Sequence, residues 1–216
     1  HKRNAGLSAT RNLGLTLING DYVGFVDSDD VCEPNMYESL IEAAQLHQAD
    51  LTLGGMRFWR QHSFGRRVPP PKVGLIDYED MIRLIFSLPP WNKTAVCGGY
   101  VMPRLYAREV LQGLSFDEDK NTCEDELFVS QVLLRCERIA VMNKLIYRYR
   151  QRAGSLVNRP IFGTYLLKGR LKIADLYLCQ DHLLRFVETA ICSQVACLRN
   201  QWFDLSETQK LFITSW

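Results

Sequence analysis

Three aspartates follow an apolar run near the start of the chain, and their spacing indicates metal-assisted phosphate chemistry. Residues 22–30 read Tyr-Val-Gly-Phe-Val-Asp-Ser-Asp-Asp, which places Asp27, Asp29 and Asp30 close together. Carboxylates in such a cluster repel one another unless a cation lies between them, and Mg²⁺ or Mn²⁺ prefers oxygen ligands. A bound divalent cation would stabilise a phosphate leaving group. The alternative is a polar turn that caps a helix beginning near Pro34.

A second acidic group follows Cys123 and supplies candidates for acid–base chemistry. Glu124 and Asp125 stand where a helix is predicted to begin, so backbone N–H groups of the first turn can orient their carboxylates. A partly desolvated carboxylate there can take a proton from a hydroxyl group as a general base. Acidic residues in a first turn are also the ordinary complement of the helix dipole, and these residues alone favour that interpretation.

Alternating strand and helix patterns provide the elements that must position these carboxylates. The run over 22–27 predicts a buried strand with the aspartates at its carboxyl end, where open α/β sheets bind ligands. The other predicted elements are a helix over 8–18 capped by Ser8 or Thr10, a helix over 34–47, a strand over 51–58, a basic, proline-rich loop over 60–75, a helix over 77–86 capped by Asp77, a strand and helix over 101–114, a helix over 124–136, a strand over 139–150 and helical spacing over 161–202.

Composition restricts the class of protein. The chain has 216 residues, of which 47% are hydrophobic, so it can bury a real core. A net charge of +2 predicts no strong attraction to nucleic acid. No stretch approaches the roughly 20 apolar residues of a membrane span. The seven cysteines are odd in number and lack a Cys-x-x-Cys pair, which favours a reducing, cytoplasmic compartment.

Four segments, taken together, resemble the bacterial family 2 glycosyltransferases with a GT-A fold. The first is Lys-Arg-Asn-Ala-Gly-Leu-Ser-Ala-Thr-Arg-Asn-Leu-Gly-Leu over 2–15, and the second is the aspartate cluster. Cys-Glu-Asp-Glu-Leu-Phe over 123–128 and Tyr-Arg-Tyr-Arg-Gln-Arg-Ala-Gly-Ser over 147–155 follow in the same order as in that family. The resemblance implies an α/β fold with a GT-A-type, Rossmann-like mixed sheet flanked by helices over 1–155. A helical C-terminal extension is expected over 156–216.

The resemblance also implies that the first strands of the family's domain are missing from this sequence. Because a βαβ unit takes about 30 residues or more, on the order of 60 to 90 residues would be absent. Part of the nucleotide pocket would be absent with them, and a sheet edge would be exposed. We therefore expect this piece alone to be inactive, to bind nucleotide sugars weakly and to self-associate.

The activity implied by the resemblance is metal-dependent transfer of a sugar, with inversion, from a nucleotide-diphosphate-sugar to an acceptor hydroxyl. Asp29 would be the direct ligand of Mg²⁺ or Mn²⁺, and Asp27 would face the ribose or a metal-bound water. Asp125 would be the general base, with Glu124 beside it. The implied acceptor is a glycan or a lipid-linked glycan, in cell-surface polysaccharide or glycan synthesis. The expected location is cytoplasmic, with peripheral association at the inner face of the membrane left open.

Arginine and amide side chains near the motifs are further candidates for binding the donor. Arg11 and Asn12 could approach the nucleotide or its diphosphate, although Arg11 could equally be a solvated surface residue. Arg150 and Arg152 could clamp phosphate oxygens. Many relatives carry a histidine in this last stretch, where this chain has Gln151 and Arg152, so charge neutralisation by arginine replaces a histidine ligand.

Trp91 and Gly99 fall where relatives shape the acceptor side. A tryptophan face can stack on a sugar ring, but a lone tryptophan is more often a core residue.

Two other classes of function fit part of the pattern. The segment from Asp27 to Val31 also matches the first motif of haloacid-dehalogenase-like phosphatases, with Asp27 as a covalent nucleophile. That fold needs a later lysine, for which Lys93 and Lys144 are candidates, and a second acidic pair at a strand end, which is not evident. A third hypothesis is a non-catalytic, glycosyltransferase-like interaction module. The presence of Asp27, Asp29 and Asp125 argues against it.

Overall fold

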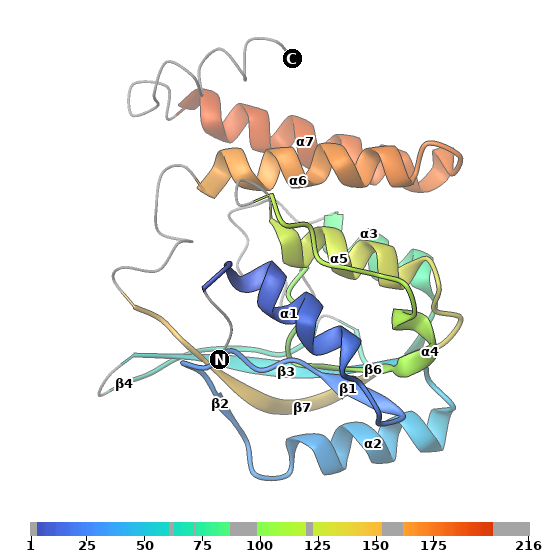
Figure 1. The fold of residues 1–216 in the computed structure, drawn as a ribbon. Helices are drawn as coiled ribbons and strands as arrows, with labels where there is room; N and C mark the ends of the chain where they lie inside the picture. The colour runs from blue at the N-terminus through green and yellow to red at the C-terminus, as the bar shows by residue number, and fades with distance from the viewer. Residues whose placement is uncertain are drawn as a thin grey trace.

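A mixed β-sheet runs through the middle of the computed structural model, with helices on both faces (Figure 1). The structure describes residues 4–60, 63–70, 72–86, 99–119, 123–152 and 162–200. Within these ranges the strands are β1 (Tyr22–Gly24), β2 (Val31–Cys32), β3 (Leu51–Arg60), β4 (Ser63–Val68), β5 (Gly74–Ile76), β6 (Arg104–Ala107) and β7 (Ile139–Arg150). The order across the sheet is β1-β6-β3-β7-β2, with β4 paired to β3 and β5 paired to β7.

The parallel pair β3 and β7 forms the centre of this sheet. It runs from Leu51 opposite Ile139 to Trp59 opposite Arg150, whereas the other described pairs are antiparallel. Its register shifts around Gly55. A Cβ atom at Gly54 would lie 2.9 Å from the Lys144 carbonyl oxygen, so the close approach of the two strands requires a glycine there.

The helices form one layer on one face and two layers on the other (Figure 1). One face carries α2 (Met36–His47), and the other carries α1 (Leu7–Thr16), α3 (Tyr78–Phe86), α4 (Arg108–Leu111) and α5 (Glu124–Leu133). The C-terminal pair, α6 (Phe162–Leu176) and α7 (Asp181–Asn200), lies over α3 and α5. One hydrophobic core extends from the sheet into this outer pair. The predicted fold class, a mixed sheet flanked by helices with a helical C-terminal part, is confirmed.

Several element predictions are also confirmed. Strand β7 covers the predicted range, and Asp77 caps α3 by accepting a hydrogen bond from the Asp80 N–H (2.8 Å). The predicted domain boundary near residue 155 lies outside the described residues. No helix in the described ranges is long and apolar enough to cross a membrane.

Three local predictions are wrong. The loop predicted over 60–75 contains β4 and the start of β5, because β4 folds back on β3, with Arg67 exposed and Val68 buried. Strand β1 ends at Gly24, since Phe25 turns out of the ladder and packs edge-on against three aromatic rings. Neither Ser8 nor Thr10 caps α1. Both lie inside the helix, and its N-cap is Gly6, whose positive φ of 100° favours glycine.

Candidate active site

The aspartate cluster forms a tight turn that strand β7 holds in place. The Asp30 N–H donates to the Asp27 carbonyl (3.0 Å). The Tyr147 hydroxyl accepts from the Asp27 N–H (3.2 Å) and donates to Asp30 Oδ2 (2.8 Å), and the Arg150 N–H donates to Asp30 Oδ1 (2.7 Å). Asp30 is therefore an anchor for this turn. Burial raises its pKa to about 6, although the hydrogen bonds from Arg150 and Tyr147 act in the opposite direction.

The alternative that this segment caps the following helix is wrong. Helix α2 begins at Met36, and its N-cap, Asn35, makes no side-chain capping hydrogen bond. The short strand β2 stands between the aspartates and the helix. The carboxylates of Asp27 and Asp29 therefore do not cap α2.

Arg11 joins the two acidic groups that the sequence separates widely. Its side chain is only 8% exposed, and Nη2 lies 3.0 Å from Asp27 Oδ1. Nη1 donates to the Asp125 carboxylate and lies 3.5 Å from Glu124 Oε1. The guanidinium also packs over the Phe116 ring, with its Cζ 5.1 Å from the ring centroid. Asp27 at the sheet edge and Asp125 on α5 thus face one cation.

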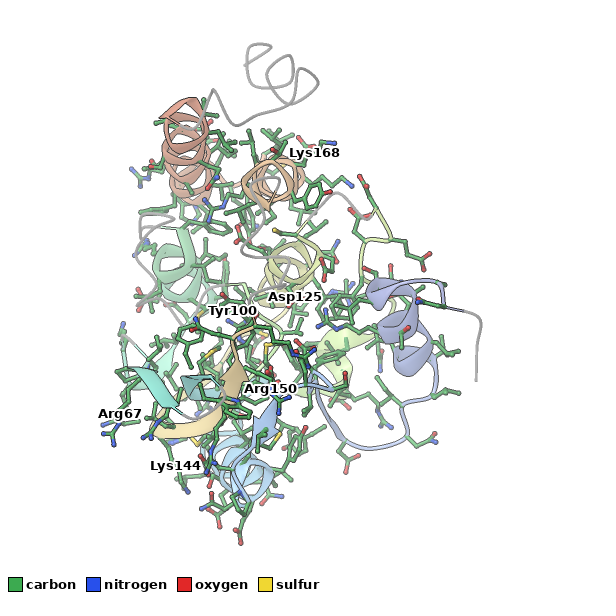
Figure 2. The ribbon with its side chains drawn as sticks, turned by 90° about the vertical axis from the view of Figure 1, so that its left-hand side faces the viewer. Arg67, Tyr100, Asp125, Lys144, Arg150 and Lys168 are labelled. Carbon is green, nitrogen blue, oxygen red and sulfur yellow. The ribbon has the colours of Figure 1, made fainter. Side chains whose placement is uncertain are left out.

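Asp125 has the protonation behaviour that a general base requires. Desolvation, together with the charges of Glu124 and Asp27, outweighs the opposing effect of Arg11 and raises the pKa of Asp125 from the ordinary 3.8 to about 7. Figure 2 shows Asp125 beside the partly buried Tyr100, and the charge of Asp125 adds to desolvation in raising the pKa of that phenol. A carboxyl group with a pKa close to neutrality can both accept and release a proton.

Arg150, the last residue of β7, and Arg152, two residues beyond it, differ in their surroundings. Arg152 Nη2 lies 3.0 Å from Asp29 Oδ2, and both side chains are partly exposed. The Arg150 guanidinium lies over Trp59, with its Cζ 4.5 Å from the ring centroid. Its buried Nε has no hydrogen-bond partner among the described residues. Arg152 therefore belongs to the acidic site, whereas Arg150 reaches that site through its main-chain N–H.

Two predicted ligand-binding residues make close structural contacts. Asn12 accepts from the Phe116 N–H (2.7 Å) and donates to the Phe116 carbonyl (3.0 Å) and to Glu118 Oε1 (3.1 Å). Asn12 thereby holds the main chain at Phe116, whose ring packs against the guanidinium of Arg11. Gly99 packs against α5, where a Cβ atom would lie 2.4 Å from Glu126 Cα. Their roles in binding donor and acceptor stay predictions, and Trp91 lies outside the described residues.

Sequence reasoning missed the structural partners of the site. Tyr147 was visible in the Tyr-Arg-Tyr-Arg motif, but no role was assigned to it. Glu126 belongs to the motif over 123–128, but its partner Arg170 could not be predicted, and Phe116 lies in no motif, because both roles depend on contacts between distant segments.

The carboxylate oxygens at this site are suitable ligands for a hard cation that also binds oxygen atoms of the substrate. No group of three or more His, Cys, Asp or Glu side chains within the described ranges could by itself hold a metal. Mg²⁺, however, is commonly held by one or two carboxylates together with phosphate oxygens of the substrate. Asp29 and Asp27 offer such carboxylates, so the residues present fit that kind of site.

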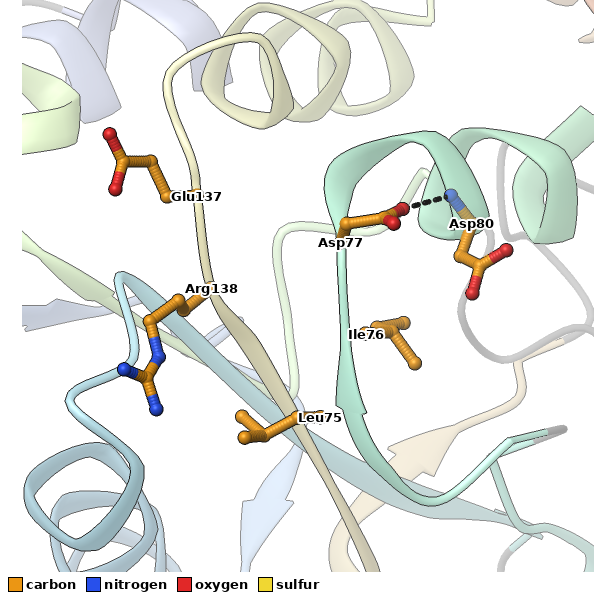
Figure 3. Close-up of a pocket in the computed structure, with 6 residues that line it drawn as sticks. All are labelled: Leu75, Ile76, Asp77, Asp80, Glu137 and Arg138. Atoms are coloured by element: carbon orange, nitrogen blue, oxygen red, sulfur yellow. Dashed lines mark hydrogen bonds between the residues drawn. The ribbon is translucent and has the colours of Figure 1, made fainter.

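Two surface hollows lie near the sheet. One is lined by residues around the end of β5 and the start of α3, together with Glu137 and Arg138, and contains none of the acidic-site residues (Figure 3). The other lies between α1 and β1 and includes Arg11. Its remaining lining is mostly apolar and includes Leu15, Val23 and Phe25. The second hollow therefore lies beside Arg11, which joins the two acidic groups.

Comparison with known proteins assigns this arrangement to a family. The profile described as Glycosyl transferase family 2 matches residues 1–111. The chain belongs to glycosyltransferase family 2. Its relatives in that family include EpsJ of Bacillus subtilis, an uncharacterized glycosyltransferase that is 33% identical over 162 residues, covering 74% of this chain and 46% of EpsJ. The minor teichoic acid biosynthesis protein GgaA of the same organism is 28% identical over 174 residues, covering 76% and 37%.

Solved structures agree with the fold of this family 2 domain. The crystal structure of Staphylococcus aureus TarS 1–349 in complex with UDP-GlcNAc matches with a TM-score of 0.63 at 22% identity. The match covers 94% of this chain and 55% of the TarS chain. The chain thus spans about half of that structure and less than half of EpsJ and GgaA.

Proposed function

We propose that the full-length protein transfers a sugar from a nucleotide-diphosphate-sugar to an acceptor hydroxyl group, with inversion. The observation that carries this proposal is the convergence of Asp27 and Asp125 on Arg11. Inverting transfer needs phosphate-binding groups on one side of the anomeric carbon and a general base on the other. In this chain Asp27 follows β1 and Asp125 lies on α5, and both carboxylates contact the guanidinium of Arg11.

Each residue of the site has a distinct part in this proposal. Asp125 takes the proton of the attacking hydroxyl, for which its pKa of about 7 is suited. Asp29 and Asp27 hold Mg²⁺ or Mn²⁺, which would neutralise the leaving diphosphate. Arg152, already beside Asp29, adds positive charge where the phosphates would bind. Glu124 contributes to the negative field that keeps Arg11 in place.

The comparisons support a nucleotide-sugar donor and a cell-surface acceptor. TarS has been crystallised with UDP-GlcNAc and with UDP, and GgaA is named for teichoic acid biosynthesis. We therefore assign the reaction to cell-surface polysaccharide synthesis. A cytoplasmic location, at the inner face of the membrane, fits the free state of the cysteines that the structure describes, which are Cys32, Cys123, Cys136, Cys179 and Cys192.

The phosphatase alternative is not favoured. It requires a lysine beside Asp27, whereas Lys144 Nζ donates to Ser39 Oγ on α2 (2.7 Å). Lys93 lies outside the described residues. The family assignment also argues against a haloacid-dehalogenase-like fold.

The test is product analysis with the full-length protein. Incubation with a panel of nucleotide sugars, with Mg²⁺, with Mn²⁺ or with EDTA, should yield one glycosylated acceptor by mass spectrometry, and only when a divalent cation is present. NMR of the new linkage should show the anomeric configuration opposite to that of the donor. Retention of configuration, transfer undiminished by EDTA, or hydrolysis of simple phosphomonoesters would reject the proposal.

A further inference from the structure

A buried ion pair connects the C-terminal helices to the start of α5. Arg170 of α6 donates from Nε to Glu126 Oε1 (2.8 Å), and the two side chains are only 6% and 12% exposed. Glu126 directly follows Asp125 in the first turn of α5. Separating such a pair leaves each charge desolvated and without its partner, which is energetically costly. The pair therefore opposes movement of α6 relative to α5.

Arg170 makes contacts in three directions. Besides Glu126, it donates from Nη1 to the Ala190 carbonyl of α7 (3.2 Å). Its Cζ lies 5.9 Å from the centre of the Phe86 ring, at the end of α3. One guanidinium therefore ties α5 to both C-terminal helices and to the helix that they cover, so its orientation leaves little freedom to Glu126.

Two glycines allow the same turn of α5 to be confined closely. A Cβ atom at Gly169 of α6 would lie 3.3 Å from the Cys123 nitrogen, just before α5 begins. A Cβ atom at Gly99 would lie 2.4 Å from Glu126 Cα. The first turn of α5 therefore packs directly on the main chain at Gly99, where a Cβ atom does not fit, and the residue before it lies tightly against α6 at Gly169.

This confinement compensates for the missing side-chain cap of α5, whose first turn is otherwise stabilised locally by its acidic residues. Its N-cap residue, Cys123, makes no side-chain capping hydrogen bond. A helix start without a cap leaves main-chain N–H groups unsatisfied and tends to fray. Fraying of this turn would displace Glu124 and Asp125, so tertiary contacts must supply the rigidity that the proposed base needs.

We propose that Arg170 and Glu126 are positioning residues through which α6 and α7 hold the Asp125 carboxylate at Arg11. This inference rests on the proposed function, because it gives the C-terminal helices a part in the same site. Neither residue touches the reacting atoms. A displacement of about 1 Å at a catalytic group can reduce turnover by about 100-fold, so loss of this contact should lower kcat by roughly 10- to 100-fold.

The experiment compares single and paired substitutions in the full-length protein. Arg170→Met should lower kcat by roughly 10- to 100-fold and leave the KM for the nucleotide sugar within about twofold. Arg170→Lys, which keeps the charge, should recover part of the turnover. The matched control is Arg185→Met, because Arg185 is exposed on α7 and its guanidinium contacts the same helix, where Nε donates to the His182 carbonyl and Cζ lies 5.7 Å from the centre of the Phe186 ring. This control should behave as the wild type.

A double variant separates positioning from stability. Replacing both members of a buried pair by apolar residues is often neutral for stability. Arg170→Met combined with Glu126→Met should therefore restore the melting temperature but not kcat. A double variant with wild-type kcat, or a kcat that follows the melting temperature through the series, would overturn the inference.

Hydrogen exchange tests the same inference without an assay of activity. The amides of residues 127–130, whose helical hydrogen bonds to the carbonyls of 123–126 close the first turn of α5, should exchange faster in Arg170→Met than in the wild type or in Arg185→Met. Unchanged exchange in this turn would overturn the inference. If the wild type transfers no sugar, the proposed function fails, and the exchange measurement alone decides whether Arg170 holds α5.

Discussion

Asp30 and Asp125 are carboxyl groups of the same site whose pKa values are both raised by desolvation, to about 6 and about 7. They differ in what holds them. Both oxygens of Asp30 accept hydrogen bonds from β7, one from a main-chain N–H and one from the Tyr147 hydroxyl. Asp125 is instead paired with a side chain, the guanidinium of Arg11. A raised pKa therefore marks an anchor in one case and a candidate base in the other, and the partners distinguish the two.

The comparison extends to the support behind each group. Asp30 is fixed by the strand that it contacts directly. Asp125 is held indirectly. The Arg170–Glu126 pair and the close packing at Gly99 hold the first turn of α5, in which Asp125 lies. An anchor can be built from rigid hydrogen bonds alone. A group that must exchange a proton needs free oxygen lone pairs, so its rigidity has to come from its neighbours.

The largest effect should come from Asp125→Asn in the full-length protein. Removing a general base lowers kcat by about 10²- to 10⁴-fold, whereas donor binding should persist because the base acts only in the chemical step. Asp29→Ala is the matched substitution, and it should abolish metal-dependent binding of the nucleotide sugar. Calorimetric titration of both variants, together with turnover, distinguishes the roles. Equal losses of binding would contradict this assignment.

The corresponding substitution at the anchor, Asp30→Ala, should act mainly on stability. It leaves the Arg150 N–H and the Tyr147 hydroxyl without their acceptor, which costs about 1–3 kcal/mol in the free energy of unfolding. Denaturant titration measures this loss. Turnover per folded molecule should fall much less than in Asp125→Asn. A stable Asp30→Ala variant with the turnover of Asp125→Asn would exchange the two roles.

The dependence of stability on pH gives a third test. Because the pKa of Asp125 is raised on folding, the native state binds more protons than the unfolded state between about pH 4 and pH 7. Its contribution to stability is therefore present at low pH and is lost as pH rises through about 7. Denaturant titrations at about pH 5 and about pH 7.5 should show a smaller loss for Asp125→Asn than for the wild type. An identical loss would mean that Asp125 titrates as it does in the unfolded chain.

The sequence was informative about elements and motifs, and less so about long-range contacts. The alternation of strands and helices predicted β7 and the C-terminal helices, and the four motifs predicted the family. The strands within 60–75 were missed because they depend on pairing with β3 and β7 rather than on local propensity. Likewise, nothing local shows that Arg11 lies between two acidic groups or that Asn12 binds the loop at Phe116.

The smallest effect should come from Tyr147→Phe, which removes one hydroxyl from the anchor and leaves its ring in the core. The phenol accepts from the Asp27 N–H and donates to Asp30, while the Arg150 N–H would still hold the other oxygen of Asp30. A net loss of about 0.5–1.5 kcal/mol is expected from an ordinary hydrogen bond. Tyr106→Phe is the comparison, because it removes a buried hydroxyl that donates to the Val101 carbonyl (3.0 Å), outside the aspartate turn. If the anchor only shapes the turn, Tyr147→Phe keeps wild-type kcat and metal affinity, and a large fall in either would show that the turn at Asp27 has to be rigid for chemistry as well.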